Sequence, residues 1–158
     1  MWVFPHCCTF KTLERRAMSK VRVLVVDDHA VVRRTICGLL ARDSAIDVIC
    51  QTASGEDAVS KASELQPDLV TMDIGLPGIT GIEAARQIRA LVPNCKIIFV
   101  SQHDSSQMVN EAMNVGGHGY VTKIDAAAEL VEAIKSVRDG TPFVSHRIRN
   151  PGTAKTGS

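Results

Sequence analysis

The chain has 158 residues, enough for one domain of ordinary size with a real hydrophobic core. Hydrophobic residues make up 45% of it and charged residues 22%, which excludes an intrinsically disordered chain. The 18 Lys and Arg residues nearly balance the 17 Asp and Glu residues, so the net charge gives no reason to expect nucleic-acid or membrane-surface binding. No apolar run approaches the roughly 18 residues of a membrane span, and we expect no membrane partner.

The cysteines are odd in number, and their spacing fits neither a disulfide framework nor a zinc site. No basic stretch or small-residue cleavage site marks a secretory signal. A reducing, cytoplasmic location is therefore predicted. The five residues are Cys7, Cys8, Cys37, Cys50 and Cys95.

The first twenty residues lack the regular pattern of the rest. Residues 1–17 show no helical or strand period and no capping signal, and the regular pattern begins at Val21, directly after Met18-Ser-Lys20. We expect residues 1–20 to be a disordered or misassigned extension, with Met18 as the natural start. Deleting residues 1–17 should then leave the melting temperature unchanged.

From Val21 onward, short apolar runs rich in β-branched residues alternate with segments whose apolar residues recur at helical spacing. The runs predict strands over 21–27, 46–52, 69–73, 96–101 and 119–122. The other segments predict helices over 30–42, 54–65, 82–91, about 105–116 and 126–138. Capping side chains are expected at Ser54, at Asp104 or Ser105, and at Asp125.

This alternation predicts an α/β fold with a doubly wound, five-stranded parallel sheet. The flavodoxin-like (βα)5 form with strand order 2-1-3-4-5 is the expected topology. In such sheets the site lies beyond the carboxyl ends of the strands, where the strand order reverses between strands one and three.

Polar residues stand at four of these strand ends: Asp27-Asp28, Asp73, Ser101 and Thr122-Lys123. Three carboxylates close together repel one another, and an oxygen-rich cluster of this kind suits Mg²⁺. No His or Cys is expected in the cluster, which argues against zinc. We expect Asp28 and Asp73 to be direct ligands and Asp27 to hold a metal-bound water. The backbone carbonyl of Gly75 would complete the protein's share.

A carboxylate can also act as a nucleophile and form an aspartyl phosphate. Lys123 and the Ser101 hydroxyl would then contact phosphoryl oxygens, because positioning and charge neutralisation do most of the work in phosphoryl transfer. Each residue also has a plain structural alternative. Asp27 or Asp28 alone would cap a helix, Lys123 alone would be solvated, and Ser101 alone would be a turn residue. Their joint occurrence at one sheet edge favours the functional interpretation.

These residues resemble a known family, the receiver domains of bacterial two-component response regulators. The resemblance covers residues 21–145. It is carried by Val23-Leu-Val-Val-Asp-Asp-His29, Met72-Asp-Ile-Gly-Leu-Pro-Gly-Ile-Thr-Gly81, Val100-Ser101 and Gly119-Tyr-Val-Thr-Lys123. The Asp-Asp-His run, the Gly119-Tyr-Val run and the closing Asp139-Gly-Thr-Pro-Phe-Val-Ser145 look like the NarL/FixJ branch.

The resemblance implies that Asp73 is the phosphorylation site and that Asp27 and Asp28 form an acidic Mg²⁺ pocket. Lys123 would be the catalytic ammonium, with Ser101 and Tyr120 as the switch residues. A histidine kinase or phosphotransfer protein would donate the phosphoryl group, and a downstream protein target or a phosphorylation-dependent homodimer would receive the signal. Such a chain catalyses its own phosphorylation and dephosphorylation without being a classified enzyme.

Several positions depart from the family pattern. Ser101 stands where Thr is commoner, Gln102 where a small residue is usual, and Ile124 where many receivers have Pro.

Residues 146–158 read as a flexible tail, too short for the helix-turn-helix domain that usually follows in this branch. We therefore expect a receiver that acts through protein contacts without specific DNA binding. A non-turning-over interaction module, a remnant of a DNA-binding regulator, and a small-phosphoester hydrolase remain the alternatives.

Overall fold

The structure is a computed structural model that describes residues 19–152. The predicted start at Met18 and the end of the predicted tail, residues 153–158, lie outside the described residues. The whole segment that resembles a receiver, residues 21–145, can therefore be followed in three dimensions.

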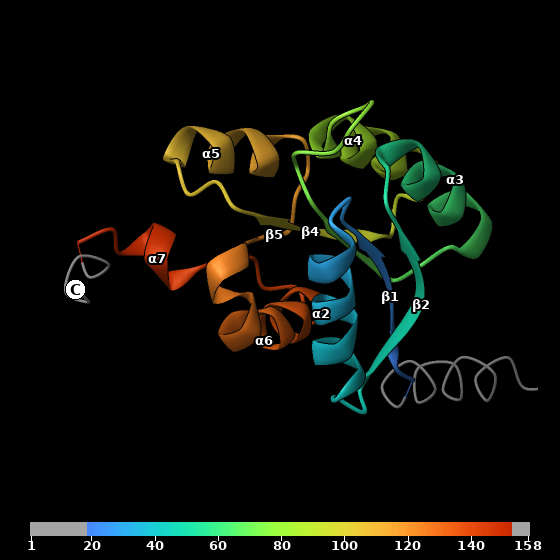
Figure 1. Cartoon of the computed structure of the whole chain (residues 1–158), viewed down its shortest axis with the longest axis horizontal. Coiled ribbons are helices and arrows are strands. Elements are labelled where there is room, and N and C mark those ends of the chain that lie inside the picture. Colours follow the sequence, from blue (N-terminus) through green and yellow to red (C-terminus); the bar gives the residue numbers. More distant parts are fainter. Residues whose placement is uncertain (1–18, 153–158) are drawn as a thin grey trace, which may run out of the picture.

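The centre of the molecule is a parallel sheet with strand order β2-β1-β3-β4-β5-β6 (Figure 1). The strands are β1 Val21–Val26, β2 Ile46–Thr52, β3 Leu69–Met72, β4 Lys96–Ser101, β5 Gly119–Thr122 and β6 Phe143–Val144. Every neighbouring pair is parallel. The five predicted strands and their order are confirmed, and β6 is an addition to the predicted sheet.

Strand β6 was missed because two residues are too short to show a strand period. Its pairing is nevertheless well defined, since Phe143 N donates to His118 O at 3.2 Å and Ser145 N donates to Tyr120 O at 2.9 Å. Phe143 is buried beside β5. The sheet edge next to β5 is thus covered by the chain's own C-terminal segment.

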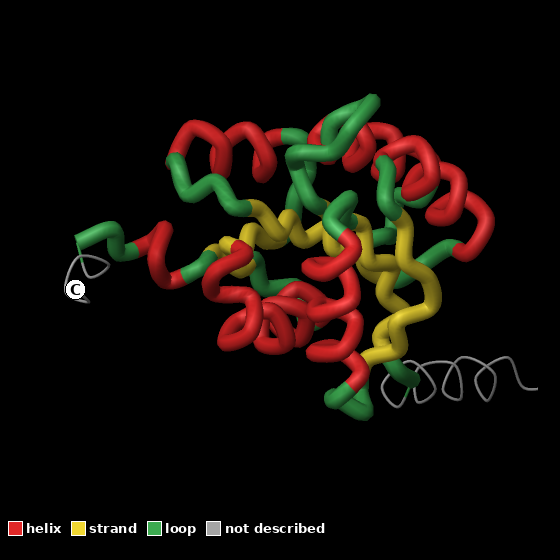
Figure 2. Tube along the Cα trace, viewed as in Figure 1, coloured by secondary structure: helices red, strands yellow, loops and turns green. Residues whose placement is uncertain are grey.

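Helices cover both faces of the sheet, as Figure 2 shows. Helices α2 (Ala30–Ala41) and α6 (Ala126–Arg138) lie on one face. Helices α3 (Gly55–Leu65), α4 (Gly81–Leu91) and α5 (Ser106–Asn114) lie on the other. Alternate residues of each strand point to opposite faces, so the sheet separates two apolar cores. Val23 and Val25 belong to the core under α2 and α6, and Leu24 and Val26 to the other.

Helix caps follow the sequence pattern at several starts. Ser54 Oγ accepts a hydrogen bond from Asp57 N, and Ser105 Oγ accepts one from Met108 N, as the capping pattern predicts. The prediction for Asp125 is wrong in one respect. Asp125 stands at the N-cap of α6, but its side chain makes no capping bond and instead accepts from Thr122 Oγ1 at 2.7 Å.

The predicted flexible tail begins with a helical turn, α7 (His146–Arg149). Glu129 Oε1 accepts from His146 N at 3.1 Å, and Arg147 Nε lies 3.1 Å from Asp125 Oδ2. These polar contacts with α6 and the residues before it hold the turn against the domain. Residues 146–149 of the predicted tail thus form a helical turn whose partners lie far away in sequence. Within residues 19–152, no helix has the length and apolar character to cross a bilayer.

Candidate functional site

The predicted site lies where the carboxyl ends of β1, β3 and β5 meet. Asp27 directly follows β1 and Asp73 directly follows β3, and the two strands pair with Val26 opposite Met72. Asp73 N donates to Val26 O at 3.0 Å, which ties the two strand ends together. Lys123 follows β5 as the first residue of a short 3-10 turn, η1 (Lys123–Asp125). The sheet thus brings together the acidic and basic residues that the sequence predicts.

Lys123 bridges two buried carboxylates. Its Nζ lies 2.9 Å from Asp27 Oδ2 and 3.1 Å from Asp73 Oδ2. The side chains of Asp27 and Asp73 are only 1% and 6% exposed, whereas that of Lys123 is 17% exposed. One ammonium therefore partly neutralises two carboxylates that have almost no contact with water.

The charge imbalance shifts the proton affinity of these groups. Burial and the neighbouring Asp27 carboxylate raise the pKa of Asp73 above its ordinary value, although Lys123 and the Gly75 amide oppose this effect. Burial by itself would lower the pKa of Lys123, but hydrogen bonds to Asp27 and Asp73 outweigh burial and raise it. Lys123 is therefore charged at neutral pH, and a second positive charge would stabilise the ionised cluster further.

Asp28 supplies the third carboxylate. Its Oδ1 is buried and accepts no hydrogen bond from the residues that the structure describes. A buried carboxylate oxygen without a hydrogen bond is costly unless another positive group satisfies it. The oxygens of Asp27 are already engaged, since Oδ1 accepts from His29 N at 2.9 Å and Oδ2 faces Lys123. Asp28 is thus the carboxylate with the most freedom to bind a cation.

His29 also belongs to this cluster. Its Nδ1 lies 3.1 Å from Asp28 Oδ1 and 3.5 Å from Asp27 Oδ1. One ligand atom each from Asp27, Asp28, His29 and Asp73 lie within 4.8 Å of one another. The expectation that no His joins the cluster is wrong. The signal was present in the sequence, where His29 follows the two aspartates directly, but the direction of its ring depends on the start of α2.

The donor set fits a hard divalent cation. Carboxylate oxygens are the ligands that Mg²⁺ prefers in proteins, and three of them converge here with a net negative charge. Asp28 Oδ1 and Asp27 Oδ2 are both buried without a hydrogen bond, and of the two only Asp27 Oδ2 already faces Lys123. The loop after β3 adds a backbone contact, because Gly75 N donates to Asp73 Oδ1 at 3.3 Å. Coordination by the Gly75 carbonyl stays a prediction.

Ser101 and Tyr120 lie beside the cluster and are linked to each other through the loop after β4. Ser101 is buried at the end of β4, and its Oγ accepts from His103 N at 3.1 Å. Tyr120 is fully buried, and its hydroxyl donates to His103 O at 2.7 Å. Both side chains therefore hold the same loop residue, a connection that the sequence does not reveal. Gln102, which lies between Ser101 and His103 in the sequence, is exposed.

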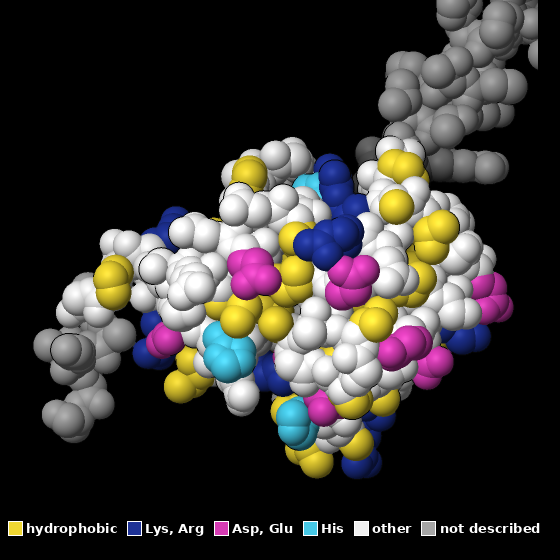
Figure 3. Space-filling model, turned by 90° about the horizontal axis from the view of Figure 1, so that it is seen from above, with side chains coloured by type: hydrophobic (Ala, Val, Ile, Leu, Met, Phe, Trp, Pro, Cys, Tyr) yellow, Lys and Arg dark blue, Asp and Glu magenta, His cyan; other side chains and the backbone are white. Residues whose placement is uncertain are grey.

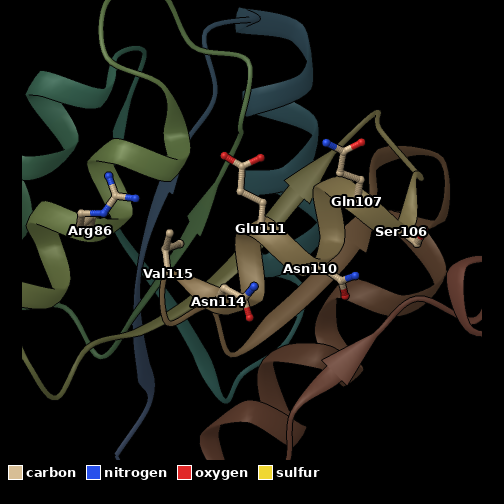
Figure 4. Close-up of a pocket in the computed structure, with 7 residues that line it drawn as sticks. All are labelled: Arg86, Ser106, Gln107, Asn110, Glu111, Asn114 and Val115. Carbon is tan, nitrogen blue, oxygen red and sulfur yellow. The ribbon is translucent and has the colours of Figure 1, made fainter.

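A separate hollow lies between α4 and α5, away from the carboxylates (Figure 4). Arg86 of α4 faces polar residues of α5 across it, and these polar side chains suit a protein surface better than a buried small molecule. It is lined by Arg86, Ser106, Gln107, Asn110, Glu111, Asn114 and Val115. Figure 3 shows this helical face from above, with charged side chains of both signs scattered over it.

Comparison with known proteins points in one direction. The sequence profile of the response regulator receiver domain matches residues 23–135. The chain is 40% identical over 128 residues to the response regulator GacA of Pseudomonas viridiflava, covering 81% of this chain and 60% of that protein. It is 37% identical over 115 residues to the response regulator protein VraR of Staphylococcus saprophyticus, covering 73% of this chain and 55% of that protein.

A solved structure is similar in the same way. A LuxR-family two-component response regulator from Aurantimonas sp. SI85-9A1 superimposes with a TM-score of 0.81 at 35% identity, covering 87% of this chain and 98% of that one. The chain spans 60% or less of the length of the two curated relatives described above. Their likeness therefore concerns the part that the chain shares with them.

Proposed function

The chain belongs to the family of response regulator receiver domains, and we propose that Asp73 is the residue at which it accepts a phosphoryl group. The observation that carries the proposal is the bridge from Lys123 to Asp73 and Asp27 at the carboxyl end of the central strands. The donor would be a histidine kinase or a histidine-containing phosphotransfer protein.

Asp73 is suited to the nucleophilic role. One of its carboxylate oxygens attacks phosphorus, the new O–P bond forms as the donor's P–N bond breaks, and the imidazole of the donor leaves. Lys123 is already placed beside Asp73 Oδ2, so its ammonium can contact a phosphoryl oxygen as negative charge arrives. Burial keeps bulk water away from the carboxylate and limits hydrolysis of the product.

The acidic residues would hold Mg²⁺, with Asp28 and Asp73 as direct ligands and Asp27 acting through a water molecule. This division is supported by Asp28 Oδ1, which accepts no hydrogen bond, and by Asp27, whose Oδ1 accepts from the His29 amide and whose Oδ2 is paired with Lys123. When bound, Mg²⁺ offsets the negative charge of the phosphoryl oxygens and of the carboxylates.

Ser101 and Tyr120 would carry the signal away from the site. If the Ser101 hydroxyl turns to the phosphoryl group, it releases His103 N, and the loop that also accepts from Tyr120 is free to move. The state that follows would present a different surface near α5, β5 and α6. The exposed residues of α5 lie at the hollow in Figure 4, whereas Val109 and Tyr120 are buried and cannot contact a partner directly.

Labelling with a small phosphodonor tests the acceptor. Asp73→Asn should abolish acid-labile phosphorylation by acetyl phosphate or a cognate kinase. Asp47→Asn, at an exposed carboxylate of β2, is the matched control and should label like the wild type. Full labelling of Asp73→Asn would overturn the assignment, and a wild type that is never labelled would favour a non-turning-over interaction module.

Titration with Mg²⁺ tests which carboxylates of the pocket are direct ligands. Asp28→Ala should weaken binding strongly, and Asp27→Ala should weaken it less, because Asp27 already holds Lys123 and the His29 amide. Unchanged affinity in both variants would rule out this pocket.

For residues 1–158 we propose protein contacts as the output, without specific DNA binding. The net charge is +1, and all five long helices of the described part pack on the sheet. A gel shift with genomic fragments at physiological salt tests this. Sequence-specific retention that strengthens on phosphorylation would contradict it.

A further inference from the structure

His29 has no part in the phosphoryl chemistry proposed above, yet its ring nitrogen faces the acidic pocket. It occupies the N-cap of α2 with an extended backbone (φ −84°, ψ 110°), and its side chain makes no capping bond. Its backbone amide donates to Asp27 Oδ1, which holds the residue against the pocket. The ring therefore does not cap the helix, and its Nδ1 faces the carboxylates of Asp27 and Asp28.

The spacing suits a shared ion. One ring nitrogen of His29 and one oxygen each of Asp27, Asp28 and Asp73 all lie within 4.8 Å of one another. Ligand atoms on opposite sides of one octahedral ion stand about 4.2 Å apart when each bond is about 2.1 Å. A pair of atoms at the 4.8 Å limit would have to approach by about 0.6 Å to reach that spacing. The His29 side chain is 66% exposed, which leaves an open path for a hydrated ion.

One further feature of the cluster points to a ligand at this place. Asp28 Oδ1 is buried without a hydrogen bond. His29 Nδ1 lies 3.1 Å from this oxygen but makes no hydrogen bond to it. A cation between the carboxylates and the ring would satisfy both atoms at once.

The added nitrogen changes which cation the pocket prefers. Oxygen ligands alone suit Mg²⁺, whereas imidazole is a good ligand for first-row transition metals and a poor one for Mg²⁺. We propose that His29 Nδ1 joins Asp28 and Asp73 as a ligand of a first-row transition-metal dication, so that His29 makes the pocket discriminate between such ions and Mg²⁺. This inference rests on the proposed function, because it uses the same carboxylates.

Mn²⁺ is the probe of choice. Among first-row dications it has the weakest preference for nitrogen ligands, so any effect of His29 on its binding is a stringent test, and its electron paramagnetic resonance signal reports free and bound ion directly. In the wild-type protein, the electron spin echo of bound Mn²⁺ should be modulated by a ¹⁴N nucleus. Labelling all histidines with ¹⁵N should change that modulation without any substitution in the chain.

His29→Asn removes the ring but keeps the backbone amide and introduces a favourable N-cap residue, so the variant should fold. Its Mn²⁺ affinity should fall about tenfold while its Mg²⁺ affinity stays within about twofold, and the ¹⁴N modulation should disappear. The matched control is His146→Asn, at a histidine of α7 whose side chain is 61% exposed, which should retain both the affinity and the modulation.

Three results would overturn the inference. They are a wild type without ¹⁴N modulation, a His29→Asn variant that keeps it, and equal losses of Mn²⁺ and Mg²⁺ affinity, which would make His29 only an electrostatic neighbour. A wild type that binds neither ion would instead contradict the pocket of the proposed function. If His29→Asn leaves both Mn²⁺ binding and phosphorylation unchanged, this inference fails while the proposed function stands.

Discussion

Gly81 lies so close to Asp73 that a Cβ at residue 81 would overlap the backbone carbonyl oxygen of Asp73. The contact is reinforced by Gly81 N, which donates to Ile74 O at 2.9 Å. The start of α4 is thus packed directly against the backbone of the proposed acceptor. The spacing between Asp73 and Gly81 in the sequence reflects this close approach.

Gly81→Ala should therefore distort the acceptor. We expect a loss of about 2–3 kcal/mol in the free energy of unfolding, since backbone atoms must move, and a slower phosphorylation of Asp73 by acetyl phosphate. Urea unfolding and labelling rates measure the two effects.

The control is Gly38→Ala, in the exposed interior of α2, where an added Cβ meets nothing within 4 Å. It should stabilise the protein by about 0.5–1 kcal/mol, because Ala is the better helix former. A Gly81→Ala variant that behaves like Gly38→Ala would show that the close contact is not needed.

Asp73→Asn should stabilise the protein at pH 7 in the absence of divalent ions, by about 1–2 kcal/mol. The pKa of Asp73 is raised by burial and by Asp27, so keeping this carboxylate charged at neutral pH costs folding energy. Because the pKa of Asp73 is higher in the folded protein than in the unfolded chain, the folded wild type takes up a proton on Asp73 more readily as the pH falls. The stability difference between the wild type and Asp73→Asn therefore shrinks as the pH falls below neutrality.

Thermal unfolding of Asp73→Asn and wild type at pH 7 and at pH 4, with and without Mg²⁺, checks this. Mg²⁺ should reduce the stability difference between the two proteins at pH 7. The ion binds the three carboxylates of the wild type more tightly than the two that remain in Asp73→Asn, so it stabilises the wild type more. An Asn variant that is less stable than the wild type without Mg²⁺ would contradict the prediction.

His118 should make the protein sensitive to mild acid. Its Nδ1 accepts a hydrogen bond from Ile97 N at 3.1 Å, which requires the unprotonated nitrogen. Burial first, then Lys96 and Arg89, lower the pKa of His118 from 6.5 to about 4. Between these values the unfolded chain binds a proton that the folded protein does not. The stability from neutral His118 is thus complete above pH 6.5 and is lost as the pH falls towards 4.

His118→Asn should lose about 1–3 kcal/mol less stability than the wild type between pH 7 and pH 4. Chemical denaturation across this pH range measures the difference, with the exposed His103→Asn as the matched control. Parallel stability curves for wild type and His118→Asn would contradict the assignment.

Ser145 should be essential for the edge of the sheet. The residue is fully buried, and its Oγ accepts from Thr122 N at 3.0 Å. Ser145→Ala would leave that buried amide without a partner and should cost about 1–3 kcal/mol. Arg147→Ala, which removes only the partly exposed ion pair with Asp125, should cost at most about 1 kcal/mol. Equal losses in the two variants would argue that the whole C-terminal segment acts as one unit.

The sequence by itself determined the alternating strands and helices, and with them the place of Asp27, Asp73 and Lys123. This was predictable because buried parallel strands are continuous apolar runs, and their carboxyl ends must meet at one edge of the sheet. The residue that follows each run is therefore a neighbour of the others, whatever the side-chain details.

Only the tertiary structure decided the depth of Tyr120, the pairing of β6, the turn of α7 and the direction of the His29 ring. Each depends on partners that are distant in sequence, such as His103 O for Tyr120 and Glu129 for His146. Local propensity carries no information about such partners, since a two-residue strand and a four-residue helix are stable only when the rest of the domain satisfies their polar groups.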